Sequence, residues 1–220
     1  PPISTQRDII NEIENIEAEY IDYQKDIKQY QNKIDELMSF LDSLAATSQI
    51  VFSLSDKNLF SIDIGKRVVA KELVYNGNIP VYSANVYEPF GYIDKLLISD
   101  FSLPSILWGI DGDWMTSYMP ENVTFYPTDH CGVLRCLTND VHPRYMAHLL
   151  ETEGKKIGFS RNLRASIDRI EGIKISVPSI ENQEKIISQV IELEQRISET
   201  QIKIDSMSGK TAEILSKYLS

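Results

Sequence analysis

The side chains best suited to chemistry in this sequence are basic residues gathered in one short stretch of its last third. Between Lys155 and Lys174 there are six lysines and arginines against two acidic residues, Asp168 and Glu171, which gives a local charge of +4. Guanidinium and ammonium groups donate hydrogen bonds to anionic oxygens, so this stretch is suited to contact phosphate. The alternative is a solvated loop whose charges face only water.

Residues for other chemistries are sparse. Cys131 and Cys136 form a C-x4-C pair in a chain with three histidines, which falls short of a zinc site and of a disulfide framework. No glycine-rich phosphate loop, H-E-x-x-H or G-x-S-x-G pattern occurs, and the D-G-D at 111–113 lacks the further ligands of a calcium loop. We expect core, cap or surface roles for the scattered histidines. The sequence therefore predicts no metal site, no cofactor and no enzymatic activity.

Charge is distributed unevenly along the 220 residues. The net charge is −10, with 42% apolar and 25% charged residues. Residues 1–45 hold four basic and ten acidic side chains, residues 46–180 hold 13 and 15, and residues 181–220 hold five and seven, so the ends carry −8 and the middle −2. The overall acidity therefore does not exclude an anionic ligand for the middle region. No apolar run approaches the ~18 residues of a spanning helix and no signal peptide is evident, so we expect a cytoplasmic protein.

The two ends of the chain carry copies of one sequence. The opening PPISTQRDIINEIENIE matches PSIENQEKIISQVIELE at a shift of 177 positions, with Pro1, Ile3 and Gln6 recurring as Pro178, Ile180 and Gln183. Apolar residues then recur at alternating spacings of four and three, through residues 9–44 and, less strictly, through 186–218. A sustained period of 3.5 residues predicts two long helices that supercoil on a partner, each about 60 Å long for ~40 residues.

Between these helices the apolar period falls to two and turn signals become dense. The pattern predicts strands at 51–55, 59–64, 79–84, 92–98, 104–110, 122–126, 132–137 and 173–177, and one helix at 143–153 that Asp140 caps and Gly154 closes. The expected fold is α+β. A mixed α/β domain at 47–178 is flanked by long helices at 1–46 and 179–220.

Three blocks of this sequence carry a resemblance to a known family. They are the P-x-I-x-x-Q-x-x-I-I starts of both helices, the block GKRVVAKELVYNGNIPVYSANVYEPFGYID and the junction RNLRASIDRIEGIKISVPSIENQ. In this order they resemble the specificity subunits of type I restriction-modification systems. Such subunits carry two target recognition domains, each reading half of a bipartite DNA site, and two long helices that pair antiparallel and bind methyltransferase subunits.

The resemblance covers only the carboxy-terminal half of such a subunit, one recognition domain between both helices. Either the chain is an excised fragment, or it is a half subunit that pairs with itself as a homodimer. The resemblance implies double-stranded DNA, methyltransferase subunits and restriction subunits as partners, with S-adenosylmethionine held by the methyltransferase. The rival interpretations are a coiled-coil adaptor whose globular domain binds protein, and a nuclease.

On this resemblance, two groups of residues are expected to contact DNA. Cations position the domain on phosphates, and amide or hydroxyl groups read base edges. The expected phosphate contacts are Lys66, Arg67, Lys71, Arg161 and Arg164. The expected base contacts are Tyr82, Ser83, Asn85 and Tyr92. The alternatives are solvated surface charge for the first group and a polar hairpin with packed tyrosines for the second. Arg164, together with Ser166 and Arg169, could equally orient the second long helix at its junction with the domain.

Overall fold

The computed structural model describes residues 2–219, apart from the side chains at positions 208, 211, 212, 215 and 219. The expected domain limits at residues 1 and 220 and the repeat position Pro1 lie outside the described residues. The elements in chain order are α1 (Ile3–Ala46), β1 (Val51–Ser53), β2 (Phe60–Ile64), the 3-10 helix η1 (Ala70–Glu72), β3 (Ile79–Tyr82), β4 (Gly91–Ile93), β5 (Ser105–Gly109), β6 (Thr116–Met119), β7 (Tyr126–Pro127), β8 (Cys131–Cys136), α2 (Pro143–Ile157), α3 (Ile167–Glu171), β9 (Lys174–Ser176) and α4 (Ile180–Leu219).

The chain forms two compact units. The helical unit comprises Pro1–Phe40 and Lys185–Ser220, and the globular unit comprises Leu41–Glu184. The globular unit thus includes the last residues of α1 and the first of α4.

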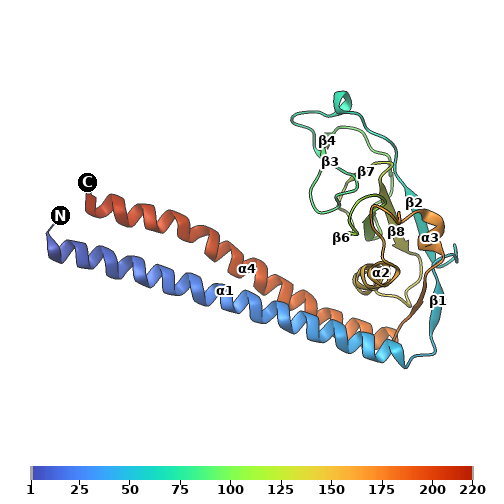
Figure 1. The fold of residues 1–220 in the computed structure, drawn as a ribbon, viewed down its shortest axis with the longest axis horizontal. Helices are drawn as coiled ribbons and strands as arrows, with labels where there is room; N and C mark the ends of the chain where they lie inside the picture. The colour runs from blue at the N-terminus through green and yellow to red at the C-terminus, as the bar shows by residue number, and fades with distance from the viewer. Residues whose placement is uncertain (1, 220) are drawn as a thin grey trace. The chain divides into compact units, whose positions relative to one another are not determined.

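In the helical unit, α1 and α4 lie side by side along their length (Figure 1). Cross-helix contacts join Glu12 to Lys217 at 2.8 Å and the Tyr23 ring to the Lys203 ammonium at 5.6 Å. The residue number on one helix rises as that on the other falls, so the predicted antiparallel pairing is confirmed. Of the seam positions expected on α1, Tyr20 alone among the described residues is classed as exposed, at 41%.

The globular unit is built on a four-stranded sheet in the order β2-β8-β5-β6, antiparallel throughout. Its central strands β5 and β8 are almost wholly buried, which explains their mostly apolar sequences. Leu107 and Val133 pair on one face and pack in a cluster with Phe125. The opposite face carries Trp108, which is fully buried, and helix α2 covers this face, with Arg144 stacked 4.6 Å from the Tyr118 ring.

Two smaller sheets complete the globular unit (Figure 1). The sheet β4-β3-β7 has an antiparallel β3–β4 pair and a parallel β3–β7 pair, and its inner side packs Val81, Ile93 and Tyr126. Strands β1 and β9 form an antiparallel pair, with Val51 opposite Ser176.

Four local predictions were wrong. The strand expected at 92–98 ends at Ile93, in β4. Helix α2 runs through Gly154 to Ile157 and ends at Gly158, which adopts the left-handed conformation at φ 81°. Its amino-terminal cap is His142, whose Nδ1 accepts from the Arg144 N–H at 3.2 Å, in place of Asp140.

The strand expected at 122–126 exists only at its end, in β7. Asn122 adopts φ 62°, which turns the chain, and its N–H donates to the Phe101 carbonyl at 2.7 Å. The strand β6, which the sequence did not indicate, pairs with β5 just before this turn.

Candidate nucleic-acid interface

Lys66 lies close to the β3–β7 pair because Gly65 lets two backbones approach closely. A Cβ at Gly65 would lie 1.9 Å from the Pro127 carbonyl oxygen, so only glycine fits there. The Lys66 N–H donates to this same carbonyl at 3.2 Å. Pro127 pairs with Tyr82 in the β3–β7 ladder. The structure thus brings one expected phosphate contact next to one expected base contact.

The expected base contacts Tyr82, Ser83 and Tyr92 lie near one another. Tyr82 ends β3 and is half-buried against the cluster that contains Leu107. Burial is the main cause that raises the pKa of the Tyr82 hydroxyl, with smaller contributions from Tyr92 and Cys131. Ser83 follows directly, and its Oγ accepts from the Thr128 hydroxyl at 3.1 Å.

Asn85 and Tyr92 are both exposed. The Asn85 Oδ1 accepts from the backbone N–H groups of Tyr87 at 2.9 Å and Glu88 at 3.3 Å, so its carbonyl shapes the loop. Its amide nitrogen keeps two donors for a ligand. Tyr92 lies in the middle of β4, opposite Pro80, with 43% of its surface exposed.

Arg164 is linked to Ser83 through one continuous set of polar contacts. The Arg164 guanidinium forms an ion pair with Asp111, and the same carboxylate contacts the His130 Nδ1. The His130 N–H donates to the Thr128 Oγ1 at 3.2 Å, and the Thr128 hydroxyl donates to Ser83. Residues separated by some 80 positions therefore belong to one connected surface.

Asp111 is held ionised in this set of contacts. Partial burial by itself raises the pKa of the Asp111 carboxyl, but the hydrogen bond from His130 and the charge of Arg164 outweigh it and hold the pKa below its ordinary value. The Arg164 charge is thereby partly neutralised. Arg161 is exposed at the tip of a tight loop closed by reciprocal backbone bonds between Ser160 and Leu163, each 3.0 Å.

Arg67 and Lys71 are exposed on the segment that leads from β2 to η1. Within residues 2–219, no hydrogen bond or ion pair joins either side chain to the other candidate residues. Their placement together with the other residues expected to contact DNA stays a prediction.

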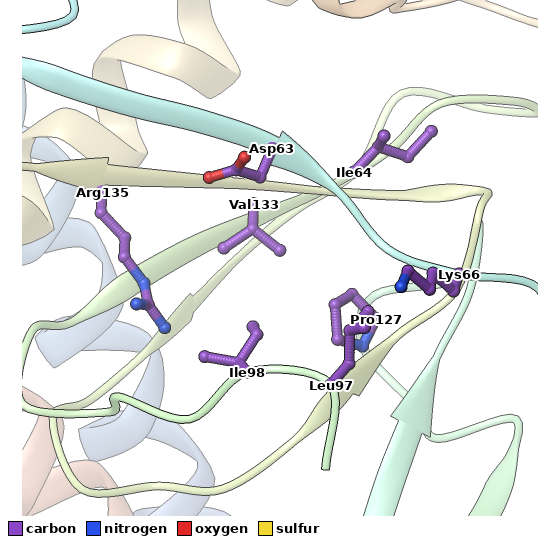
Figure 2. Close-up of a pocket in the computed structure, with 8 residues that line it drawn as sticks. All are labelled: Asp63, Ile64, Lys66, Leu97, Ile98, Pro127, Val133 and Arg135. Atoms are coloured by element: carbon purple, nitrogen blue, oxygen red, sulfur yellow. The ribbon is translucent and has the colours of Figure 1, made fainter.

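A recess beside Lys66 contains Arg135, a cation that was not among the residues expected to contact DNA. The cavity measures about 250 Å³ and is bordered by apolar side chains, among them Ile98 and Pro127, together with Asp63, Lys66 and Arg135 (Figure 2). The Arg135 Nε donates to the Ser105 Oγ at 2.8 Å, whereas its buried Nη2 has no partner among the described residues. Burial lowers the pKa of the Arg135 guanidinium. The signal in the sequence was a charged residue inside the otherwise apolar strand GVLRCL.

The geometry suits contact with an anionic polymer. Polar contacts connect Arg164 with Ser83, and Lys66 lies beside them. No group of three His, Cys, Asp or Glu side chains within the described chain is arranged to hold a metal ion. No helix in the described chain is long and apolar enough to cross a membrane.

Comparisons with known proteins agree with this geometry. Residues 51–205, well over half of the chain, match the family model described as type I restriction modification DNA specificity domain. A putative type I specificity subunit from Mycoplasma pneumoniae (strain ATCC 29342 / M129) is 28% identical over 92 residues, which cover 41% of this chain and 49% of that protein.

Solved structures share the fold. The S subunit of a type I restriction-modification system from M. genitalium superposes with a TM-score of 0.65 at 16% identity, over 98% of this chain and 61% of that one. The HsdS subunit from Thermoanaerobacter tengcongensis gives a TM-score of 0.53 at 15% identity, over 99% and 59%. The chain thus spans about half the length of the curated relative and about three fifths of these structures. The predicted fold class and family resemblance are confirmed.

Proposed function

Because the chain belongs to the family of type I restriction modification DNA specificity domains, we propose that its globular unit binds duplex DNA and reads one half of a bipartite target. The helical unit recruits methyltransferase subunits, and through the assembled complex the restriction subunits. S-adenosylmethionine belongs to the methyltransferase partner, and the chain itself contributes recognition without catalysis. We place this complex in the cytoplasm, where the two free buried cysteines stay reduced.

The observation that carries this proposal is the connected surface from Arg164 through Thr128 to Ser83, with Lys66 beside it. Phosphate contacts position a protein on DNA, whereas groups that reach base edges provide sequence specificity. We assign the first role to Lys66, Arg67, Lys71, Arg161 and Arg164. We assign the second to Tyr82, Ser83, Asn85 and Tyr92.

The ion pair with Asp111 divides the cations into two classes. Lys66 and Arg161 make no ion pair within residues 2–219, so each is free to neutralise one phosphate. Arg164 keeps its guanidinium oriented by Asp111, and its Nη2 contacts that carboxylate at 3.0 Å. Its contribution to DNA affinity is therefore smaller, and its orientation is fixed before binding.

Recruitment of protein partners is supported by apolar residues on the outer surface of the helical unit. Ile10 on α1 is 52% exposed and Ile202 on α4 is 66% exposed. Exposed isoleucines in a helix pair whose seam is already filled are suited to contact a partner. The same surface would serve self-association in a homodimeric half subunit.

The test of half-site reading is selection from a randomised duplex library with the purified chain, repeated with a methyltransferase subunit of the same system. We expect an enriched short motif in at least one condition. Two inverted identical halves at fixed spacing would indicate a self-paired half subunit, whereas one short half would indicate a monomer. No enrichment under either condition would refute DNA reading and favour the adaptor interpretation.

The phosphate contacts are tested by the salt dependence of affinity for the enriched duplex. Each lost phosphate contact should reduce the magnitude of the slope of log K against log salt by about 0.9. We expect this reduction for Lys66→Ala and for Arg161→Ala, and a smaller one for Arg164→Ala. The matched control is Lys57→Ala, which removes a lysine with 85% side-chain exposure outside the proposed interface. Unchanged slopes for both Lys66→Ala and Arg161→Ala would show that the phosphate surface lies elsewhere.

A further inference from the structure

The globular unit gathers its exposed aromatic rings in one stretch of 18 residues. All residues of this unit are described, and its exposed aromatic side chains all fall between positions 75 and 92. Tyr75 is 98% exposed, Tyr87 59%, Phe90 53% and Tyr92 43%. The other aromatic residues of the unit are buried or half-buried. Such a concentration of exposed rings indicates a contact surface.

Tyr75 is presented by a turn with a fixed backbone. The Gly77 N–H donates to the Val74 carbonyl at 3.1 Å, which closes the turn, and the Val74 N–H donates to the Tyr92 carbonyl at 2.9 Å, which ties the turn to β4. A Cβ at Gly77 would lie 2.8 Å from the Ile93 nitrogen, so glycine is needed for this close approach. The ring of Tyr75 therefore extends into solvent from a rigid support, next to the exposed Tyr92.

The charges around the turn suit an anionic partner. Segment 65–95 contains four basic and three acidic residues, a charge of +1 in a chain of −10. One of the acids, Glu72, contacts the Lys95 ammonium at 2.7 Å and accepts the Val69 N–H at 2.9 Å, so its charge is compensated locally. The exposed cations Arg67 and Lys71 precede the turn.

We propose that Tyr75 stacks into an opened base step of bound duplex DNA, with Tyr92 at its border, so that the domain distorts the DNA that it reads. This proposal rests on the DNA binding proposed above. Because the turn is already closed by hydrogen bonds, no loop has to become ordered when DNA binds. The Tyr75 ring is almost fully exposed in the free protein, so inserting it into DNA breaks no packing within the protein. Apolar wedges of this kind unstack base steps and bend the duplex, and the sequence dependence of that deformation adds to specificity.

Stacking of an aromatic ring on a base sets the size of the expected effect. Loss of one such contact weakens binding by roughly 5- to 150-fold. Because Tyr75 is almost fully exposed, its replacement should leave the melting temperature of the free protein unchanged.

The test uses the duplex enriched by library selection, with 2-aminopurine placed at each position in turn and a donor–acceptor dye pair at its ends. We expect the full chain to raise 2-aminopurine fluorescence at one step and to shorten the end-to-end distance. Tyr75→Ala should abolish both signals and weaken affinity 5- to 150-fold, whereas Tyr75→Phe, which keeps the ring, should retain them. The matched control Tyr20→Ala removes a 41% exposed tyrosine from α1 and should change neither signal.

The outcomes separate this proposal from DNA binding itself. Salt-dependent binding of the enriched duplex without any Tyr75-dependent unstacking would overturn the wedge and leave the DNA-reading function intact. A Tyr75→Ala variant that binds DNA normally but loses the methyltransferase subunit would assign the aromatic surface to a protein partner and likewise overturn it. Failure of the library selection would overturn both.

Discussion

Replacing Gln183 with alanine removes a buried side chain near the start of α4 and the three hydrogen bonds that it makes. Its side chain is fully buried, and all three of its hydrogen bonds reach backbone groups of the globular unit. The Oε1 accepts from the His142 N–H at 2.9 Å, and the Nε2 donates to the carbonyls of Asp140 at 3.1 Å and Pro178 at 2.8 Å. One amide thus joins the first turn of α4 to the loop that precedes α2.

The expected loss follows from these three contacts. Leaving a buried backbone donor or acceptor without a partner costs about 1–3 kcal/mol. We take the lower end of this range, about 1 kcal/mol, for each of the two carbonyls, because a carbonyl oxygen has two lone pairs. We take about 2 kcal/mol for the N–H group, which gives a total loss of about 4 kcal/mol. Gln183→Glu should lose at least as much, since it directs a carboxylate oxygen at two carbonyl oxygens.

Urea unfolding followed by tryptophan fluorescence measures this loss, because Trp108 and Trp114 both lie in the globular unit. The matched control is Gln189→Ala, which removes an exposed glutamine on the same helix. Its side chain donates to the Lys185 carbonyl at 3.1 Å, and the change should stay within about 0.5 kcal/mol. If Gln183→Ala unfolded at the same urea concentration as this control, the assignment of a stabilising amide clamp would be refuted.

Three further predictions concern the globular unit. Burial raises the pKa of the Cys131 and Cys136 thiols to about 12, so a thiol reagent at pH 8 should label neither until denaturant is added, and rapid labelling of the native protein would contradict their burial. Burial lowers the pKa of His142, so as pH falls the unfolded chain takes up a proton at this residue at a higher pH than the folded chain does. The free energy of unfolding should therefore decrease as pH drops below about 6.5. His142→Asn should keep the cap on the amino-terminal end of α2 but reduce the loss of stability between pH 7.5 and pH 5.5, as measured by melting curves at both pH values. An unchanged loss would exclude His142 as its source. Gly154→Ala should destabilise the protein, although alanine has the better helix propensity, because the new methyl group would lie 2.2 Å from the Trp114 ring. A higher melting temperature for this variant would show that the ring can move away.

The sequence predicted the helices well because their signal is local and repeated. A heptad period extends over dozens of residues, so individual exceptions such as the exposed Tyr20 do not obscure it. The buried strands β5 and β8 could also be predicted, since short, mostly apolar runs between turn signals are typical of central strands.

Long-range placement could not be predicted in the same way. The end of α2 was assigned to Gly154 because glycine often ends helices, yet this glycine is needed for the packing of Trp114, 40 positions earlier. Likewise, no local signal connects Asp111 with His130 and Arg164, because their contact depends on how β5, β8 and the segment before α3 are folded together. The sequence thus pointed to Arg164 and Ser83 as candidates, whereas it gave no sign of the contacts through Asp111 and His130 that connect them.

The pairing of β1 with β9 makes the recognition domain replaceable as a block. The chain enters the domain at Val51 and leaves it at Ser176, and these two residues lie opposite each other in one ladder. The Leu54 N–H and the Val177 N–H extend the ladder beyond both ends, at 3.0 Å each. Everything between the two strands can thus differ in length and sequence while the entry and exit points keep their spacing. If the domain reads DNA and the helices recruit partners as proposed above, recombination that exchanged the intervening segment would give a new DNA preference on unchanged helices. The target would then vary while the assembly surfaces stayed the same.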